Sequence, residues 1–155
     1  MRKALISEAI LLPIYLSVGL FGYWEFVDTE SPSELSYQHD KFISVPVHDR
    51  KSAREFAIEE AAPGQTVYRY IEYTLKNKSP GLLRRTWTCG EFVLQSPVRT
   101  SIGEVGEHKR SIYHTVPPFI TKPVVCRWDQ RIEYKLNPVK TVTVEYPPIT
   151  VRVVP

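Results

Sequence analysis

The sequence predicts a mainly β protein: an immunoglobulin-like antiparallel β-sandwich preceded by one N-terminal transmembrane helix. Its 155 residues contain 13 prolines and 9 tyrosines but 1 methionine, a composition that favours extended, turn-rich structure over a helical bundle. From residue 41 onward, short runs of alternating apolar and polar residues lie between turns that contain proline or glycine, as in sandwiches. A separate apolar block occupies the N-terminus, so the membrane helix is expected apart from the sheets.

Residues 1–27 are the first element, a predicted signal-anchor helix. Residues 9–24 carry no charge, and they reach the roughly 20 residues of a spanning helix once residues 4–7 are included and Glu8 snorkels toward the headgroups. The basic pair near the start places the N-terminus in the cytoplasm, and the aromatic pair at the far end fits a membrane interface. These anchor residues are Arg2, Lys3, Tyr23 and Trp24.

Two other interpretations of this segment stay open. A basic start followed by an apolar stretch also fits a cleaved signal peptide, although no A-x-A cleavage site follows it. A core helix at the start of a soluble domain is the third interpretation. The signal anchor and the cleaved signal peptide both imply that the remaining residues are exported from the cytoplasm. With an uncleaved anchor, the chain is predicted to be a single-pass inner-membrane protein whose C-terminal domain is periplasmic, or more generally extracytoplasmic.

Residues 28–40 are polar, contain Pro32 and lack an apolar period, so they are predicted to form a tether. Residues 41–155 form the predicted sandwich domain, which is long enough for one hydrophobic core. About seven or eight strands fit this length, and an open barrel is the alternative architecture. The expected strands are residues 42–47, 65–76, 82–95 (with a break at Gly90), 98–102, 109–116, 124–136, 139–146 and 149–154.

One short helix is expected before the clearest strand. Ser52 and Glu55 have the spacing of a capping box, and apolar residues follow until Pro63 and Gly64 end the segment. A strand followed by a bulge is the alternative for the same residues.

Residues 65–76 form the clearest strand, because their side chains alternate over the whole length. One face is predicted to serve the core, although Arg69 interrupts it; its apolar members are Val67, Ile71, Tyr73 and Leu75. The opposite face is predicted to point outward as a partner-binding site, because tyrosines are common in binding hot spots. Its residues are Tyr68, Tyr70 and Glu72.

The two cysteines, Cys89 and Cys126, lie in separate expected strands. In an oxidising compartment, a disulfide between neighbouring or facing strands is the simplest prediction, with two buried free thiols as the alternative. Trp87 and Trp128 each lie two positions from a cysteine, so each shares its face and is expected to pack against the bridge. The tryptophan that lies between the cysteines of true immunoglobulin domains, about a dozen residues after the first, is absent, so the term immunoglobulin-like describes architecture only.

The sequence carries few signals for catalysis, metal binding or nucleic-acid binding. Its net charge of +3 combines 20 basic with 17 acidic residues, too mixed to indicate nucleic acid. No nucleophile elbow, P-loop or dinucleotide-binding motif occurs. The 4 histidines are scattered and expected in solvated loops, so no metal site or cofactor is predicted. We therefore expect no enzymatic activity.

Two stretches carry a resemblance. Residues 62–70, followed by Thr86-Trp87-Thr88-Cys89, resemble exported β-sandwich proteins of bacteria and their phages, in which a Pro-Gly turn leads an aromatic strand toward a cysteine. Residues 136–138 and 146–149, before the final valine-rich strand, are similar to the end of small phage-encoded, membrane-anchored proteins of unknown function. The resemblance implies the periplasmic side of a bacterial inner membrane, and no activity.

These observations together predict a membrane-anchored, extracytoplasmic binding or structural module. It would present a sandwich face to a protein or another envelope component, with no nucleic-acid partner. A virion structural component is one alternative. An envelope-active hydrolase is the other, with carboxylates brought together by the fold; the single acidic residues available are Glu91, Glu104, Glu107, Asp129 and Glu133.

Overall fold

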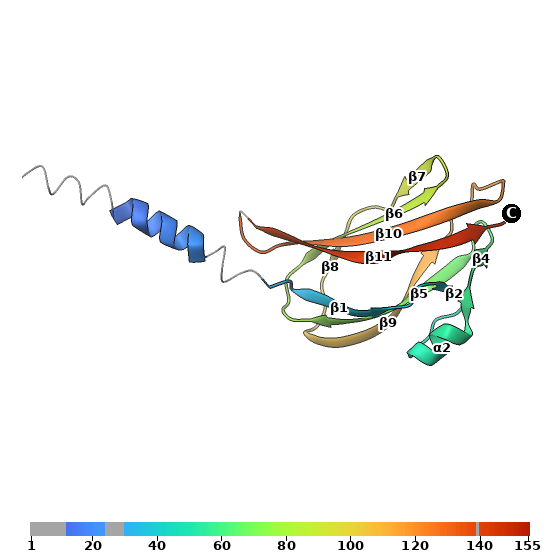
Figure 1. Ribbon diagram of the computed structural model, residues 1–155, viewed down its shortest axis with the longest axis horizontal. Helices are drawn as coiled ribbons and strands as arrows, with labels where there is room; N and C mark the ends of the chain where they lie inside the picture. Colours follow the sequence, from blue (N-terminus) through green and yellow to red (C-terminus); the bar gives the residue numbers. More distant parts are fainter. Residues whose placement is uncertain (1–11, 24–29, 139) are drawn as a thin grey trace, which may run out of the picture.

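The structure is a computed structural model that describes residues 12–23, 30–138 and 140–155. Residues 12–23 form a helix (Figure 1). Its large apolar side chains are exposed. Within the described residues, no helix is both long and apolar enough to cross a membrane. Of the predicted anchor residues, Tyr23 lies in this helix and is exposed, whereas Arg2, Lys3 and Trp24 lie outside the described residues.

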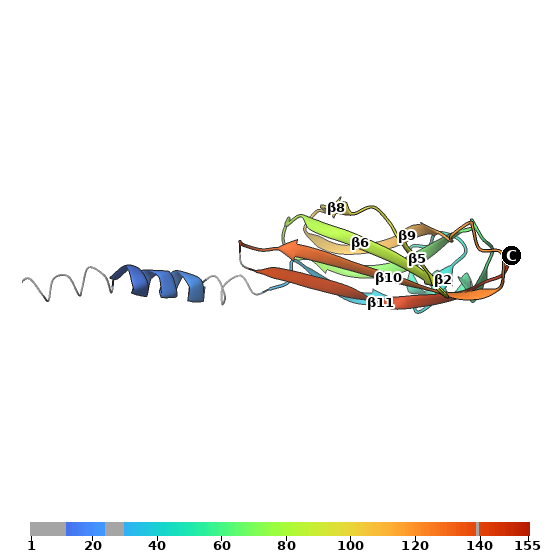
Figure 2. The same ribbon diagram turned by 90° about the horizontal axis from the view of Figure 1, so that it is seen from above.

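The described part of the chain is mainly β, and its strands form two sheets that pack face to face (Figures 1 and 2). Sheet A contains β1 (Ser33–Gln38), β2 (Phe42–Ile43), β3 (Ala57–Ile58), β5 (Thr66–Leu75) and β9 (Gly106–Thr115). Sheet B contains β4 (Glu60–Ala61), β6 (Gly81–Cys89), β7 (Phe92–Gln95), β8 (Arg99–Ser101), β10 (Val124–Lys135) and β11 (Thr141–Val153).

Each sheet is built around long antiparallel strands. In sheet A, β1 and β2 pair with one edge of β5, and β9 pairs with the other edge. In sheet B the order is β4-β11-β10-β6, and β7 and β8 then pair with successive parts of the far edge of β6. Only β4 and β11 pair in parallel among the described strands. The expected strands 65–76, 98–102, 109–116 and 124–136 are confirmed to within a few residues, and the expected break at Gly90 is confirmed as a turn between β6 and β7.

The core between the sheets contains the disulfide. Cys89 on β6 lies directly opposite Cys126 on β10, and the two are bonded. The next inward-facing pair along the same strands is Trp87 and Trp128, whose ring centroids lie 6.5 Å apart. All four side chains are buried in one cluster with Phe42 of sheet A. The predicted disulfide is therefore confirmed between neighbouring strands, and the tryptophans pack beside it.

The prediction of a tether over residues 28–40 is wrong from Ser33 onward, because Ser33–Gln38 is strand β1. The register of β1 against β5 shifts between Leu35 and Tyr37, which marks a bulge. Leu35 therefore packs between the sheets, while Tyr37 packs on the outer side of sheet A. This switch of faces removes the period-2 pattern from the sequence, so the strand looked like a polar linker.

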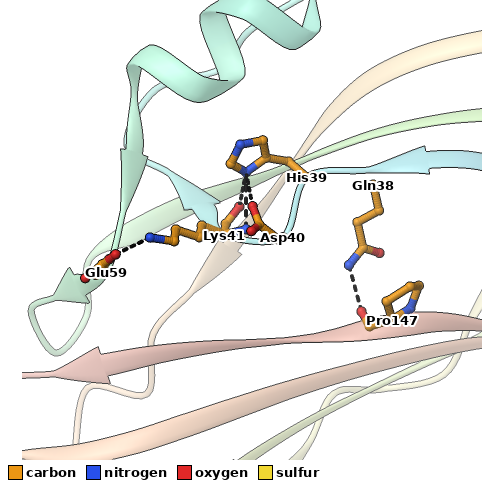
Figure 3. A network of polar contacts seen from close by, with 6 residues as sticks. All are labelled: Gln38, His39, Asp40, Lys41, Glu59 and Pro147. Carbon is orange, nitrogen blue, oxygen red and sulfur yellow. Dashed lines mark hydrogen bonds and ion pairs between the residues drawn. The ribbon is translucent and has the colours of Figure 1, made fainter.

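The turn expected at Pro147 and Pro148 is also wrong, because β11 runs through both prolines. The two residues lie opposite the single residue Asp129, which makes a bulge where the missing proline N–H groups are tolerated. Gln38 Nε2 donates a hydrogen bond of 2.7 Å to the Pro147 carbonyl, which joins β1 to β11 across the two sheets (Figure 3).

The expected helix exists, but it begins earlier than the capping box at Ser52 predicts. Helix α2 (Arg50–Glu55) has Asp49 as its N-cap, whose side chain accepts a 2.8 Å hydrogen bond from the Ser52 backbone N–H. The helix ends at Phe56, and the next residues form the short strands β3 and β4 instead of a longer helix. The sequence did contain a signal for this earlier start, because Asp49 is a favourable N-cap residue directly before Arg50 and Lys51.

Candidate functional site

The predicted binding residues lie on the outer face of β5, as their alternation indicated, but that face is not free. Helix α2 and the chain after β2 cover it, so that Tyr70 is fully buried against Ile43, Val47 and Ala53. Tyr68 is partly buried beside the same cluster, and Glu72 is also buried. The expectation of exposed tyrosines is therefore wrong at Tyr70, because sequence alternation shows only which side of a sheet a residue occupies.

Glu72 is held by a complete set of partners. Arg50 Nε donates to Oε1 at 3.0 Å, and Arg50 Nη2 donates to Oε2 at 2.7 Å. The Tyr70 hydroxyl donates to Oε1 at 2.7 Å, and the Arg50 guanidinium lies 4.2 Å from the centre of the Tyr37 ring. The hydrogen bonds from Arg50 lower the pKa of Glu72. These contacts fasten α2 to sheet A and give Tyr70 and Glu72 a structural role; partner binding at this face stays an untested prediction.

A second polar group lies at the corner between β1 and β2 (Figure 3). His39 is buried, and its Nδ1 accepts a 3.2 Å hydrogen bond from the Lys41 backbone N–H. The Lys41 ammonium forms an ion pair with Glu59, between β3 and β4. This network fixes the corner, and it shows that the expectation of solvated loop histidines is wrong for His39. No group of three or more His, Cys, Asp or Glu that could hold a metal occurs in the part of the chain that the structure describes.

The inner face of β5 contains an arginine in an unusual environment. Arg69 is fully buried between the sheets, with its guanidinium 4.6 Å from the ring centroids of both Trp128 and Tyr146. None of its guanidinium nitrogens has a hydrogen-bond partner among the described residues. Burial lowers the pKa of Arg69 to about 9. The two aromatic faces stabilise the cation only in part, because such contacts do not satisfy its N–H groups.

Two further basic side chains lie beside Arg69. Arg85 of β6 is half-buried, and its Nε donates a 3.2 Å hydrogen bond to Gln130 Oε1. Burial lowers the pKa of Arg85, and Arg99 adds to this shift. His114 of β9 is buried; burial and the charges of Arg85 and Arg69 lower its pKa to about 2. We call Arg69, Arg85, His114, Gln130 and Tyr146 the arginine cluster.

The arginine cluster has no internal counter-charge. Among the described residues, no carboxylate forms an ion pair with Arg69 or Arg85, and Nε2 of the neutral His114 has no hydrogen-bond partner. A buried cation without an anion is costly, and proteins usually supply one. The cluster is therefore the strongest candidate for a functional site in the described structure.

The cluster opens to solvent through Arg85. This side chain lines a cavity of about 310 Å³ together with Leu94 and Arg99 from sheet B and Tyr113 from β9. It also lines a cavity of about 220 Å³ between Leu83 of β6 and Ile112 of β9, in which Tyr146 forms part of the wall. Both cavities therefore lie between the edges of the two sheets, on the side where β9 ends sheet A.

This side of the molecule is open because the two sheets differ in width there. Strand β9 pairs only with β5 among the described strands, whereas β6 carries β7 and β8 further outward. Phe92 and Leu94 of β7 lie opposite Cys89 and Trp87, so they belong to the inner face of sheet B. They are nevertheless 65% and 42% exposed. We call the outer edge of β9, together with these β7 side chains, the open side.

Of the acidic residues considered for catalysis, Asp129 borders the arginine cluster, because it lines a cavity of about 430 Å³ together with Arg85, Gln130 and Tyr146. Asp129 forms an ion pair with Arg127 at 2.8 Å, and Glu133 forms one with Arg131 at 3.1 Å. Both lie on the outer face of sheet B, since they alternate with the buried residues of β10. Glu104 forms an ion pair with Lys78 at 2.9 Å, near the turn before β9. What the structure gathers at the open side is positive charge.

Sequence reasoning noticed Arg69 only as an interruption of an apolar face, and it did not identify the cluster. One signal was present, because Arg85 shares the face of Trp87 and Cys89 and so was also an inward-facing charge. Comparison of the sequence with models of known protein families and with curated proteins finds no match.

Proposed function

We propose that the chain is an extracytoplasmic binding module with an immunoglobulin-like sandwich, held at a membrane by its N-terminal segment, and that the open side is its binding surface. The observation that carries the binding role is the unpaired edge of β9 beside exposed inner-face side chains of sheet B, among the described strands.

The strand order supports the immunoglobulin-like assignment. In chain order, β1, β5 and β9 form one sheet and β6, β10 and β11 form the other, which corresponds to the A-B-E and C-F-G sheets of such domains. Constant-type immunoglobulin domains have a further strand, D, beside E. In the described structure the equivalent position beside β9 contains no strand, and this is the open side.

Two features support an exported, membrane-held protein. The Cys89–Cys126 disulfide is typical of oxidising compartments, where disulfides form and persist. The described helix also exposes its large apolar side chains, which is costly in water and favourable in lipid. These exposed apolar side chains include Leu12, Ile14, Leu16, Val18, Leu20 and Phe21.

An extended polypeptide is the occupant that fits the open side. An unpaired strand edge presents backbone N–H and C=O groups, and a partner strand can satisfy them by adding to the sheet. A strand added to β9 would lie over the exposed side chains of Phe92 and Leu94, and would bury them. The module would then bind through backbone pairing, with the cavities below accepting alternate side chains.

Site-specific photo-crosslinking tests the binding surface. A photoreactive residue replaces Tyr113 in the full-length chain, and a matched control replaces Val125; their native side chains are 63% and 61% exposed. We expect a crosslink to another polypeptide from position 113 and none from 125, and loss of the crosslink when Phe92→Ser is added. Equal crosslinking at both positions, or at neither, contradicts the proposal. A product of twice the chain's mass would identify a second copy instead of a distinct partner.

Membrane attachment has its own test. The full-length chain should pellet with membranes and resist carbonate extraction, and protease should remove the sandwich domain only from the outer side. Recovery of the intact chain in the soluble fraction would contradict the anchor.

A further inference from the structure

The uncompensated charge of the arginine cluster identifies what the open side would recognise. Arg69 cannot reach solvent, and its neighbours offer aromatic faces and another cation. Burial of an unpaired charge is costly enough that such groups normally have a partner. On the outer side of the same strand, the buried Glu72 has one in Arg50. No ion pair among the described residues supplies a counter-ion for Arg69 or Arg85, so an anion from outside them would compensate this charge.

Arg85 is the group that such an anion would contact. It lines the cavities at the open side, whereas Arg69 lies behind it and lines neither of them. The two charges are close enough for Arg85 to affect the pKa of Arg69. An anion at Arg85 would therefore be held by one direct guanidinium contact and by the field of a second, buried guanidinium.

The approach to Arg85 through these two cavities is also positive, whereas Asp129 and Glu145 line a third cavity, of about 430 Å³, that Arg85 also borders. Arg99 lines the cavity of about 310 Å³, and Arg110 lines the cavity of about 220 Å³. No carboxylate among the described residues lines either cavity. A rim of one sign attracts a segment of the opposite sign and rejects a basic one.

We propose that the arginine cluster binds a carboxylate, carried by an acidic side chain of an extended polypeptide that adds to the edge of β9. This inference rests on the proposed function. A single carboxylate matches Arg85, the guanidinium of the arginine cluster that lines both cavities, and planar guanidinium groups bind carboxylates through paired hydrogen bonds.

Ser96 provides a way to supply the carboxylate from within the chain. It follows Gln95 of β7, and its backbone N–H donates a 3.0 Å hydrogen bond to the Arg85 carbonyl. Ser96 and Arg85 also line the same cavity of about 310 Å³. Ser96→Asp should place a carboxylate within reach of Arg85. The control is Ser96→Asn, because asparagine has the size of aspartate but no charge. We expect Ser96→Asp to raise the Tm of the full-length chain by about 3 °C relative to Ser96→Asn.

Binding of defined peptides tests the external carboxylate. The probes are blocked nine-residue peptides of alternating valine and threonine, with either glutamate or glutamine at each position in turn. For the wild type we expect the best glutamate peptide to bind at least tenfold more tightly than its glutamine counterpart. Arg85→Gln and Ser96→Asp should each abolish this preference, and Ser96→Asn should keep it. Fluorescence anisotropy with the full-length chain measures the affinities.

Three other results would overturn the inference, and each can be distinguished from failure of the proposed function. Equal binding of glutamate and glutamine peptides excludes carboxylate recognition, while it leaves binding at the β9 edge and the crosslink from position 113 intact. Displacement of the glutamate peptide by an equal concentration of free acetate or inorganic phosphate shows that a small anion, and not a polypeptide, is the ligand. Failure of every peptide to bind also overturns it, and the crosslinking result then decides the proposed function separately.

Discussion

A guanidinium group lies at each face of β5, and the two groups are in opposite situations. On the outer face, Arg50 of α2 meets Glu72 in a bidentate pair, and the Tyr70 hydroxyl completes the set. On the inner face, Arg69 is fully buried, its guanidinium lies over the rings of Trp128 and Tyr146, and the nearby Arg85 carries the same charge. The described residues thus provide a counter-ion where the charge holds elements together, and none of them forms an ion pair with Arg69 or Arg85.

This difference separates a structural charge from a candidate binding charge. A satisfied pair adds stability by joining α2 to sheet A, and its removal should weaken the fold. An unsatisfied buried cation lowers stability, so its presence requires another explanation. Ligand binding is such an explanation, because a residue that is unfavourable in the free protein can be favourable in the complex.

Removal of the disulfide is the largest perturbation of the inner side. Cys89→Ser or Cys126→Ser should lower the free energy of unfolding by about 3 to 4 kcal/mol on the chain-entropy model. The double variant should lose no more than either single variant, because each change removes the same bond. Urea unfolding of the full-length chain measures these values. Alkylation of both thiols in the native, oxidised protein would contradict the prediction.

Glu72→Gln tests the outer face. The change leaves Arg50 without its carboxylate, and we expect a loss of about 2 kcal/mol, less than for a fully buried pair because Arg50 is partly exposed. Glu34→Gln is the control, since Glu34 forms a 3.3 Å ion pair with Lys76 at the surface. The control should lose less than about 1 kcal/mol. Equal losses for the two variants would show that the outer pair is not structural.

Arg69→Met tests the inner face and should act in the opposite direction. Methionine has a similar length and no charge, so we expect a gain of about 1 to 2 kcal/mol in unfolding free energy. The same variant should weaken binding of the glutamate peptide if Arg69 contributes its charge to the ligand. A loss of stability greater than about 1 kcal/mol would show that the cation supports the core.

His114 gives the most specific effect, through pH. Its folded-state pKa of about 2 lies below the ordinary value of 6.5, so between these values the unfolded chain binds a proton that the folded chain does not. Stability should therefore fall as the pH drops below 6.5, by up to about 1.4 kcal/mol per pH unit from this group. The slope should decrease in His114→Leu and not in the control His48→Leu. Identical slopes in all three proteins would contradict the burial of a neutral His114.

Much of the fold could be predicted from local sequence patterns. The alternation of residues 65–76 gave both faces of β5, and the shared faces of Trp87 with Cys89 and Trp128 with Cys126 gave the disulfide environment. Among the elements that were missed, β1 and the proline-containing part of β11 each contain a bulge that breaks the period. A bulge depends on the partner strand, so a pattern within one segment does not reveal it.

The arginine cluster could not be assembled from the sequence for a different reason. Arg69, Arg85 and His114 come from three strands, and their proximity depends on how sheet A lies over sheet B. Similarly, the burial of Tyr70 depends on α2, whose Ala53 packs in the same cluster on the outer face of β5. Alternation predicted the side of each residue, whereas the packing of other elements decided what covers that side.

The parallel pairing of β4 with β11 has a consequence for when the domain can fold. During synthesis β4 emerges well before Arg152 and Val153, the residues with which it pairs. Until β11 is made, β10 lacks its longest neighbour and the Trp128 region of the core stays incomplete. Pairings between such distant residues form slowly, because a long loop must close before any contact is gained. A nascent chain with this topology cannot complete sheet B or the core around Trp128 until β11 has been made.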